Sequence, residues 1–279
     1  MTYSASPERA DDVRFGGDQQ LLSLQLVRSA IANPWLWVTL SWHDIVQSYR
    51  RTTLGPLWIT MNMLIFAAAM TIVYSAIFGV SPTEYGVFVV TSMTIWWWIL
   101  GILNEGGTTF IIYGQFIRSM PCDKAVFVWA AAFKQMIILA HHAVIYLLLM
   151  VFGMLKPSLY MLLAVPAVFV VFLMTVPMIG LLAILCARYR DLPRLISSAT
   201  VILMMITPVF WQPSMLSGWR TLLYEFNPLY YLIEVLRRPM LGEPISGLTV
   251  SVIVCMFGAI WALGSVFFGR YQRYIVFWL

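Results

Sequence analysis

The chain has 279 residues, of which 61% are hydrophobic and 10% are charged. An ordinary soluble domain is about half apolar and about a quarter charged, so this composition excludes a soluble globular protein. A disordered chain is also excluded, because disorder requires low hydrophobicity and high charge. The net charge of +5 comes from scattered Lys and Arg residues, which does not indicate a nucleic-acid-binding surface. The remaining class is a polytopic membrane protein.

The N-terminal part is expected to lie outside the membrane. Residues 1–20 are polar and carry no basic start followed by an apolar core, so no cleavable signal peptide is expected. Residues 21–54 are expected to form helices at the cytoplasmic interface. Within them, apolar residues recur at helical spacing with a basic end, as in an interfacial helix; the stripe is Trp35, Val38, Trp42, Ile45 and Tyr49. A helix packed in a protein core would show the same pattern.

Residues 55–279 are predicted to form an all-α membrane domain with six spans. Each predicted span is an apolar run long enough to cross a hydrocarbon core of about 30 Å. The runs cover about 57–78, 86–107, 125–152, 159–187, 195–212 and 248–268. Six spans place both termini on one side. With the N-terminus inside, twelve Lys and Arg residues are cytoplasmic and four are external, which predicts an N-in, C-in orientation.

Two connecting segments are predicted to be helical without crossing the membrane. Residues 108–121, between the second and third spans, are too polar to cross and too regular for a simple loop. Residues 213–247 contain apolar and aromatic pieces that are each too short to span. We expect a re-entrant or outer-leaflet helical hairpin there, at about 219–238, with its backbone satisfied by protein or by a cavity.

No residue pattern predicts catalysis or a metal site. The three cysteines are far apart, and the sequence contains no phosphate-binding loop, so the chain is not expected to bind ATP itself. Glu105 and Lys134 are the only charges well inside the predicted spans. They lie equally far from the turn joining their helices, which predicts an ion pair at one depth. The pair is interpreted as a structural clamp, and the alternative is a substrate or coupling site.

Aromatic residues are frequent and clustered. The cluster positions are Trp96, Trp97, Trp98, Trp211, Tyr224, Tyr230 and Tyr231. Tyr and Trp commonly form belts at the membrane interface. Trp96–98 are instead in the middle of a predicted span, which favours a channel or a partner helix. A path for sugars is the sharper hypothesis, because aromatic faces stack on the apolar faces of pyranose rings. The candidates for lining it are Trp96, Trp97, Trp98, Tyr224 and Tyr230.

Several short motifs, taken in order, resemble one family. They are DIVQSYRR at 44–51, LGPLW at 54–58, IRSMP at 117–121, YRDL at 189–192 and NPLYYLIE at 227–234. In this order, over spans of this length, the sequence resembles the permease subunits of type-2 ABC exporters for cell-surface polysaccharides, including O-antigen, capsule and teichoic-acid exporters. The resemblance runs from about residue 35 to residue 279. One departure is Ser119–Met120, where family members often carry a basic pair.

The resemblance implies a homodimer in the bacterial inner membrane that works with two separate ABC ATPase subunits. ATP and Mg would then bind to those partners, and this chain would need no cofactor. The family's coupling helix corresponds to about 114–121, with the contact residues Gly114, Gln115, Phe116, Ile117, Arg118 and Pro121. The cargo implied is a glycan on a polyprenyl diphosphate. Membrane lipids are further expected partners, and no nucleic-acid partner is expected.

Arg50 and Arg51 are the candidates for contacting that diphosphate, because guanidinium groups suit it. Anchoring to anionic lipid headgroups is an equally good interpretation of the pair. Two other functions fit the chain as a whole, namely an integral-membrane enzyme acting on lipid-linked sugars and a type-2 exporter of a small molecule.

Overall fold

The computed structural model describes residues 25–55, 57–120 and 122–279, and these residues are helical with no strand. The early helices are α2 (Gln25–Ala32), α3 (Pro34–Ser48), α4 (Leu57–Phe78), α5 (Pro82–Ile112), α6 (Gly114–Ser119) and α7 (Ala125–Val151). The later α-helices are α8 (Ala164–Arg188), α9 (Leu192–Ile206), α10 (Leu222–Glu225), α11 (Pro228–Met240), α12 (Gly247–Tyr271) and α13 (Ile275–Trp278). Short 3₁₀ turns occur at Leu159–Leu163, Pro213–Met215, Gly218–Thr221 and Gln272–Tyr274.

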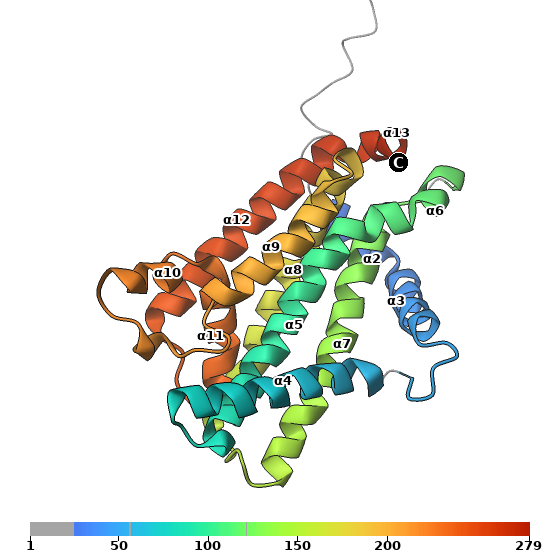
Figure 1. Ribbon diagram of the computed structural model, residues 1–279. Coiled ribbons are helices and arrows are strands. Elements are labelled where there is room, and N and C mark those ends of the chain that lie inside the picture. The colour runs from blue at the N-terminus through green and yellow to red at the C-terminus, as the bar shows by residue number, and fades with distance from the viewer. Residues whose placement is uncertain (1–24, 56, 121) are drawn as a thin grey trace, which may run out of the picture.

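Helices α5 and α8 form the centre of the bundle (Figure 1). They pack on each other, and α7, α9, α11 and α12 surround them. The core includes Trp96, Trp98 and Phe110 from α5 and Ile179 and Ile184 from α8. The outer helices expose apolar side chains instead, which a soluble protein would bury. A membrane or another subunit is the environment that such a surface requires.

Within the described part of the chain, five helical segments are long and apolar enough to cross a membrane. They are Leu57–Phe78, Pro82–Ser119, Ala125–Val151, Leu159–Arg188 and Gly247–Trp278. The run predicted as a further span at 195–212 behaves differently. Helix α9 ends at Ile206, since Thr207 is extended and precedes Pro208, which disfavours helical geometry in the residue before it. Its 15 residues reach only about 22 Å as a helix.

Helix α4 runs across α5 and α7 and not alongside them (Figure 1). Near its start, the Thr60 hydroxyl donates to the main-chain oxygen of His141 on α7, at 3.2 Å. Near its end, the Phe78 ring meets the Tyr85 ring in the first turns of α5, with centroids 5.9 Å apart. The helix therefore bridges two of its neighbours.

Helices α8 and α12 approach each other closely at Gly264. A Cβ atom at Gly264 would lie 2.8 Å from the carbonyl oxygen of Pro177, which sits within α8. Real Cβ atoms essentially never approach backbone this closely, so only glycine permits this packing. Phe268, one turn later on α12, is fully buried and lies against Gly180 of α8.

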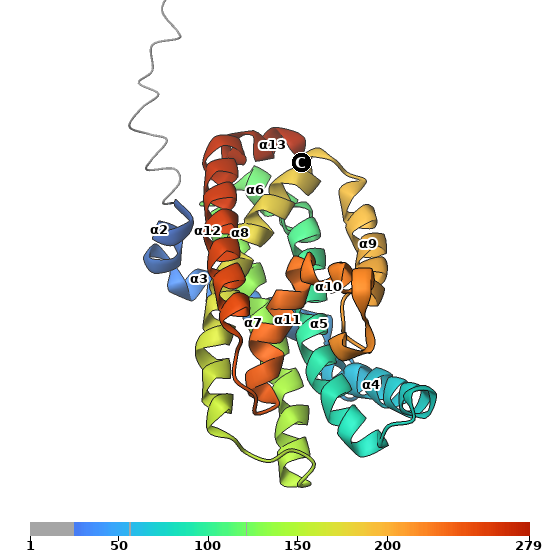
Figure 2. The same cartoon turned by 90° about the vertical axis from the view of Figure 1, so that its left-hand side faces the viewer.

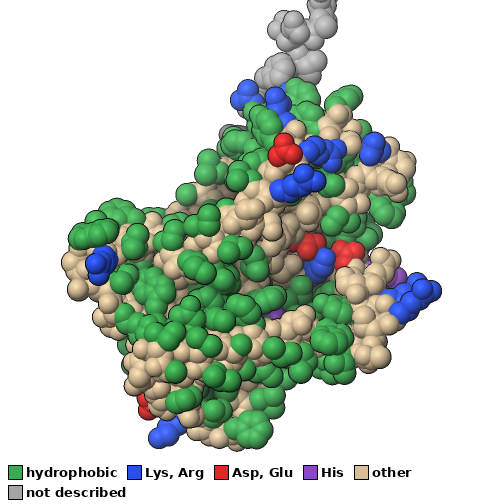
Figure 3. All heavy atoms as spheres, viewed as in Figure 1, with side chains coloured by type: hydrophobic (Ala, Val, Ile, Leu, Met, Phe, Trp, Pro, Cys, Tyr) green, Lys and Arg blue, Asp and Glu red, His purple; other side chains and the backbone are tan. Residues whose placement is uncertain are grey.

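The two ends of the bundle carry different elements. Helices α6 and α13 lie together at one end, and α10 and α11 lie towards the other (Figures 1 and 2). On the face drawn in Figure 3, Lys and Arg side chains gather at the α6–α13 end, while hydrophobic side chains cover most of the surface below it. The candidate functional residues are therefore described from the α6–α13 end towards the α10–α11 end.

Candidate functional site

The segment predicted as a coupling helix forms α6, a six-residue helix that follows α5 after Tyr113. Ile117 and Gly114 are buried, whereas Gln115 and Arg118 are exposed. Phe116 and Met120 are 54% and 53% exposed. Pro121 lies outside the described residues. A short helix that holds one side in the protein and offers two large apolar side chains outward has the form of a docking element for another protein.

Helix α13 and the residue after it pack against α6. The Leu279 side chain lies against Gly114, where a Cβ would be 3.6 Å from it. The Arg190 guanidinium donates to the main-chain oxygens of Trp278 and Leu279, at 2.9 and 2.8 Å. The Arg188 guanidinium lies 5.2 Å from the centre of the Trp278 ring, a cation–π contact. Movement of α6 is thereby tied to the end of α8.

Helix α3, predicted to lie at the interface, is attached to the bundle by a face that the sequence stripe did not identify. Ser41 donates to the main-chain oxygen of Ala130 on α7, at 2.8 Å, and Trp37 packs edge-on against Phe133. The Tyr113 hydroxyl donates to the Asp44 carboxylate, which links α3 to the start of α6.

The expected single apolar stripe of α3 is therefore wrong in detail. Ile45 is buried in the bundle, while Trp35 and Trp42 are 80% and 59% exposed. The stripe divides because Ile45 packs with the α7-facing side, whereas the two tryptophans point away from the chain. The exposed tryptophans keep the surface character of an interfacial helix.

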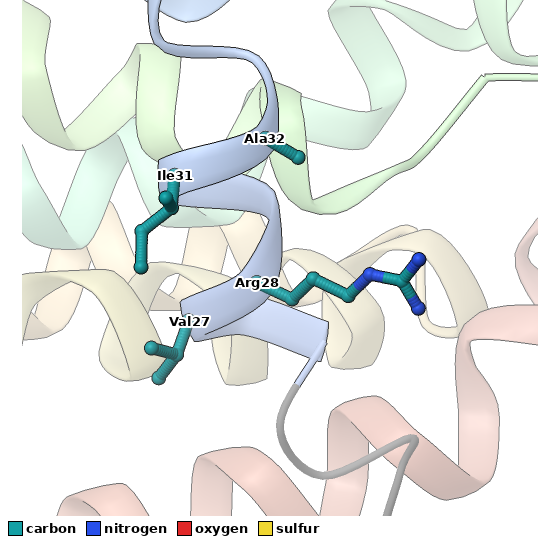
Figure 4. A pocket seen from close by; sticks show the side chains of 4 residues that line it. All are labelled: Val27, Arg28, Ile31 and Ala32. Atoms are coloured by element: carbon teal, nitrogen blue, oxygen red, sulfur yellow. The ribbon is translucent and has the colours of Figure 1, made fainter.

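Helix α2 has the same two-sided character over a shorter length. Val27 and Ile31 project from one side of the helix and Arg28 and Ala32 from the other (Figure 4). These four residues line a shallow cavity of about 410 Å³. Val27 and Ile31 are exposed apolar residues beside an exposed basic one, which suits the boundary between headgroups and acyl chains.

The structure places Arg50 and Arg51 side by side just after α3, both exposed. Arg51 adopts a positive φ of 69°, unusual for a residue other than glycine. The turn is held by Thr52, whose N–H and hydroxyl both donate to the main-chain oxygen of Tyr49, at 3.1 and 2.8 Å. Among the described residues, neither guanidinium has an ion-pair partner.

Glu105 and Lys134 are brought together between α5 and α7. Lys134 Nζ lies 2.9 Å from Glu105 Oε1, and the two side chains are 17% and 13% exposed, respectively. The Gln135 amide donates to the other carboxylate oxygen, at 3.4 Å. The carboxylate thus bonds to two neighbouring residues of one helix, as a structural clamp would.

The aromatic candidates separate into two groups. Trp96 and Trp98 are 1% and 0% exposed within the single chain, so they pack against neighbouring helices, which was the alternative to lining a channel. The reason is that they project from α5, the central helix, towards its neighbours. Trp97 is partly exposed, with its ring edge-on to His142. Tyr224 and Tyr230 are partly exposed and in contact, with ring centroids 5.0 Å apart.

A buried charge cluster on α11 was not predicted from the sequence. The Arg237 guanidinium is 2% exposed and donates to the Glu234 carboxylate, to Ser92 Oγ at 3.1 Å and to the Pro208 oxygen at 2.6 Å. Its guanidinium lies 4.7 Å from the centre of the Phe88 ring. Arg238 Nε donates to the other Glu234 oxygen at 2.7 Å. Glu at i with Arg at i+3 and i+4 on a helix was the available signal.

Comparison with known proteins adds the family. Residues 36–241 match the family model described as "ABC-2 type transporter". The chain belongs to the ABC-2 type transporter family. Two curated proteins are similar, both named "O-antigen export system permease protein RfbA" from Klebsiella pneumoniae. One is 26% identical over 71% of this chain and 77% of its own length, and the other 23% identical over 78% and 85%.

As an ABC-2 permease with five apolar helices of sufficient length among its described residues, the chain is a multi-pass protein of the inner membrane. Such permeases are transporter components that pair with an ABC ATPase subunit. The matched region contains α6, α11 and all of α3 except Pro34 and Trp35, whereas α2 and α13 lie outside it.

Proposed function

We propose that this chain is the membrane-spanning subunit of an ATP-driven exporter that moves a polyprenyl-diphosphate-linked polysaccharide, O-antigen or a related surface glycan, across the inner membrane. The observation that carries the proposal is the similarity to two O-antigen export permeases along most of the length of both chains. The chain works as a homodimer, with the channel formed between or within the two copies.

In this proposal the chain crosses the membrane six times with both termini inside. Helix α9 and the turn after it make the fifth crossing, with the buried Val209 and Phe210 continuing where the helix stops. The positive-inside distribution of Lys and Arg supports this orientation. The α6–α13 end is then cytoplasmic, and the α10–α11 hairpin is external.

The ATPase docks on α6. Phe116 and Met120 supply exposed apolar contacts, and Gln115 and Arg118 supply polar ones. ATP and Mg bind to the partner and not to this chain, so hydrolysis is performed outside it. Closure of the ATPase pair pushes α6, and the α13 contacts pass the movement to α8.

The cargo enters beside α3. Exposed guanidinium groups at Arg50 and Arg51, without an ion-pair partner in the described part of the chain, suit a diphosphate, and Trp35 and Trp42 suit the surrounding lipid. Trp97, Tyr224 and Tyr230 remain the aromatic candidates for the glycan path, since each is partly exposed.

A gene-deletion strain complemented with variants tests the function. We expect deletion to remove the polysaccharide from the cell surface and to leave lipid-linked glycan in the inner leaflet. Restored export of a small molecule alone, with surface glycan unaffected by deletion, would contradict the proposal. An active protein that modifies lipid-linked sugar without any ATPase would also contradict it.

Docking on α6 is tested with Phe116→Asp. We expect this variant to lose co-purification with its ATPase and to abolish export. Phe226→Asp is the matched control, because Phe226 is 81% exposed but lies beside α10 at the opposite end. Equal ATPase binding by both variants would exclude α6 as the docking element.

A further inference from the structure

A cleft of about 460 Å³ opens at the external end, between the first turns of α5, the segment after α9 and helix α11. Figures 1 and 2 show α11 beside this end of α5. The volume lies within the range of roughly 300–1,000 Å³ that small-ligand sites occupy. The cleft is separate from the α6–α13 end and from Arg50 and Arg51.

The floor of the cleft is rigid. It includes Glu234 and Arg237, which are almost completely buried and bonded to each other. Arg237 also bonds to Ser92 on α5 and to the Pro208 oxygen, so the three walls are fixed by one guanidinium. A cleft whose walls are held in this way is preorganised for a ligand.

The rim offers hydrogen-bonding groups that the chain itself does not use. Glu84, Gln212 and Ser214 line the cleft, and no side-chain hydrogen bond to them is present within the described ranges 25–55, 57–120 and 122–279. The Tyr230 hydroxyl also has no hydrogen-bond partner there, although its ring contacts Tyr224 and Tyr231. Carboxylate, amide and hydroxyl groups together accept from and donate to hydroxyl-rich molecules.

Charge argues against an anionic ligand. The lining carries three carboxylates, on Glu84, Glu234 and Glu243, and two guanidinium groups, on Arg237 and Arg238. Glu234 neutralises only one of the two arginines that it bonds, and Arg238 stays 37% exposed, but three carboxylates against two guanidinium groups leave the lining with a net charge of −1. A phosphate group would be repelled there, whereas a neutral polyol would be accepted.

Apolar side chains complete the lining. Phe88 and Tyr230 present aromatic surface, and Val87 and Leu241 present aliphatic surface. Pyranose rings combine an apolar C–H face with a rim of hydroxyls, and this lining has both complements. We propose that the cleft binds a neutral stretch of one or a few sugar residues of the exported glycan as the chain leaves the membrane.

This inference rests on the proposed function, because it takes the cargo to be a glycan. The first test is binding of short oligosaccharides, released by mild acid from the surface polysaccharide, to the permease–ATPase complex in nanodiscs. We expect Glu84→Gln and Gln212→Met each to raise the Kd about tenfold, since the first replaces a charged acceptor by a weaker neutral one and the second removes the amide altogether. Glu225→Gln is the matched control, because Glu225 is an exposed glutamate on α10 outside the cleft lining.

The second test places a photo-crosslinker at the exposed Ser214 position in exporting cells. We expect glycan adducts when the ATPase is active and none when it is inactivated, because only an exported chain then reaches the cleft. Adducts that persist with an inactive ATPase would point to external sugar and overturn the inference. Oligosaccharide binding that is absent, or equal in all variants, would also overturn it while leaving export, and hence the proposed function, intact.

Discussion

The two charge clusters of this protein differ in both burial and connectivity. Glu105 and Lys134 form a pair that bridges α5 and α7, with both side chains still partly exposed. Glu234, Arg237 and Arg238 form a cluster on one helix, and its Arg237 reaches α5 and the segment after α9. The first resembles a clamp on two neighbouring helices, whereas the second joins three parts of the fold.

The difference has an energetic meaning. Breaking the Glu105–Lys134 pair removes one ion pair and leaves Glu105 with the Gln135 amide as a partner. A buried guanidinium that loses its partners leaves uncompensated charges and unsatisfied donors in the interior. The cluster of Glu234, Arg237 and Arg238 should therefore affect the free energy of unfolding more strongly than the Glu105–Lys134 pair does. This is expected although the cluster lies outside the long apolar helices.

The largest effect is expected for Arg237→Met. This change removes the hydrogen bonds to Ser92 and Pro208 and leaves Glu234 with Arg238 alone. We expect the free energy of unfolding to fall by about 3–5 kcal/mol, measured by SDS titration of the reconstituted chain. Arg220→Met is the control, because Arg220 is exposed, and it should change the value by less than about 0.5 kcal/mol. A fall below about 1 kcal/mol for Arg237→Met would remove the distinction between the clusters.

A smaller loss is expected for Ser92→Ala. The Ser92 hydroxyl accepts one hydrogen bond from Arg237 and donates to the Phe88 oxygen, at 3.1 and 2.8 Å. Since Arg237 keeps two other acceptors, we expect the same titration to show a loss of about 1–1.5 kcal/mol. Ser251→Ala should be nearly neutral, because its exposed hydroxyl only bonds back to Gly247 in its own helix. Equal losses in the two variants would mean that the tie to α5 carries no energy.

The Glu105–Lys134 pair is tested by a double-mutant cycle with Glu105→Gln and Lys134→Met. We expect a favourable coupling energy in the unfolding experiment that is smaller than the loss for Arg237→Met, because this pair joins only two helices and Glu105 keeps the Gln135 amide when Lys134 is removed. Export should continue at a reduced level in each single variant. Full assembly of Glu105→Gln without any export would contradict the clamp and indicate a part in transport.

The smallest effect is expected in the pH dependence of stability, through Tyr230 beside the Glu234–Arg237–Arg238 cluster. Burial, and next the Glu234 carboxylate, raises the pKa of the Tyr230 phenol above its usual value of about 10. The folded state then holds this proton more tightly than the unfolded state does. Its contribution is fully present below about pH 10 and is lost as the pH rises through the raised pKa. Stability should therefore be flat between about pH 6 and 9 and fall above about 10.

Tyr230→Phe separates this contribution from general alkaline denaturation. The variant should show a shallower decline above about pH 10 than the unmodified chain in the same SDS titration. Identical alkaline declines would exclude Tyr230 as their source.

The comparison also explains what the sequence could and could not predict. The long apolar runs predicted α4, α5, α7, α8 and α12, because burial of backbone in lipid requires uninterrupted helices. Glu105 and Lys134 stood out because each interrupts such a run. Arg237 did not, because it lies in a segment that the apolar pattern assigned to an external connection, where a basic residue is unremarked.

Packing within the chain was the part that the pattern could not give. Trp96 and Trp98 were predicted to lie within a long apolar helix, but their burial depends on which helix is central. Likewise, helical spacing identified one apolar face of α3. A second face, which carries Ser41 and Trp37, is recognised only from its contacts with α7. Periodicity describes one helix at a time, whereas these contacts depend on pairs.

The glycine at position 264 has a consequence for how α8 and α12 can move. Because Pro177 packs closely against Gly264, α8 and α12 would have to separate before they could slide past each other. We expect the two helices to move as one unit. Helix α13 continues from the same end of α12 and holds the Leu279 side chain against Gly114. A movement of α6 would therefore reach α12 and α8 through the C-terminal contacts at Leu279.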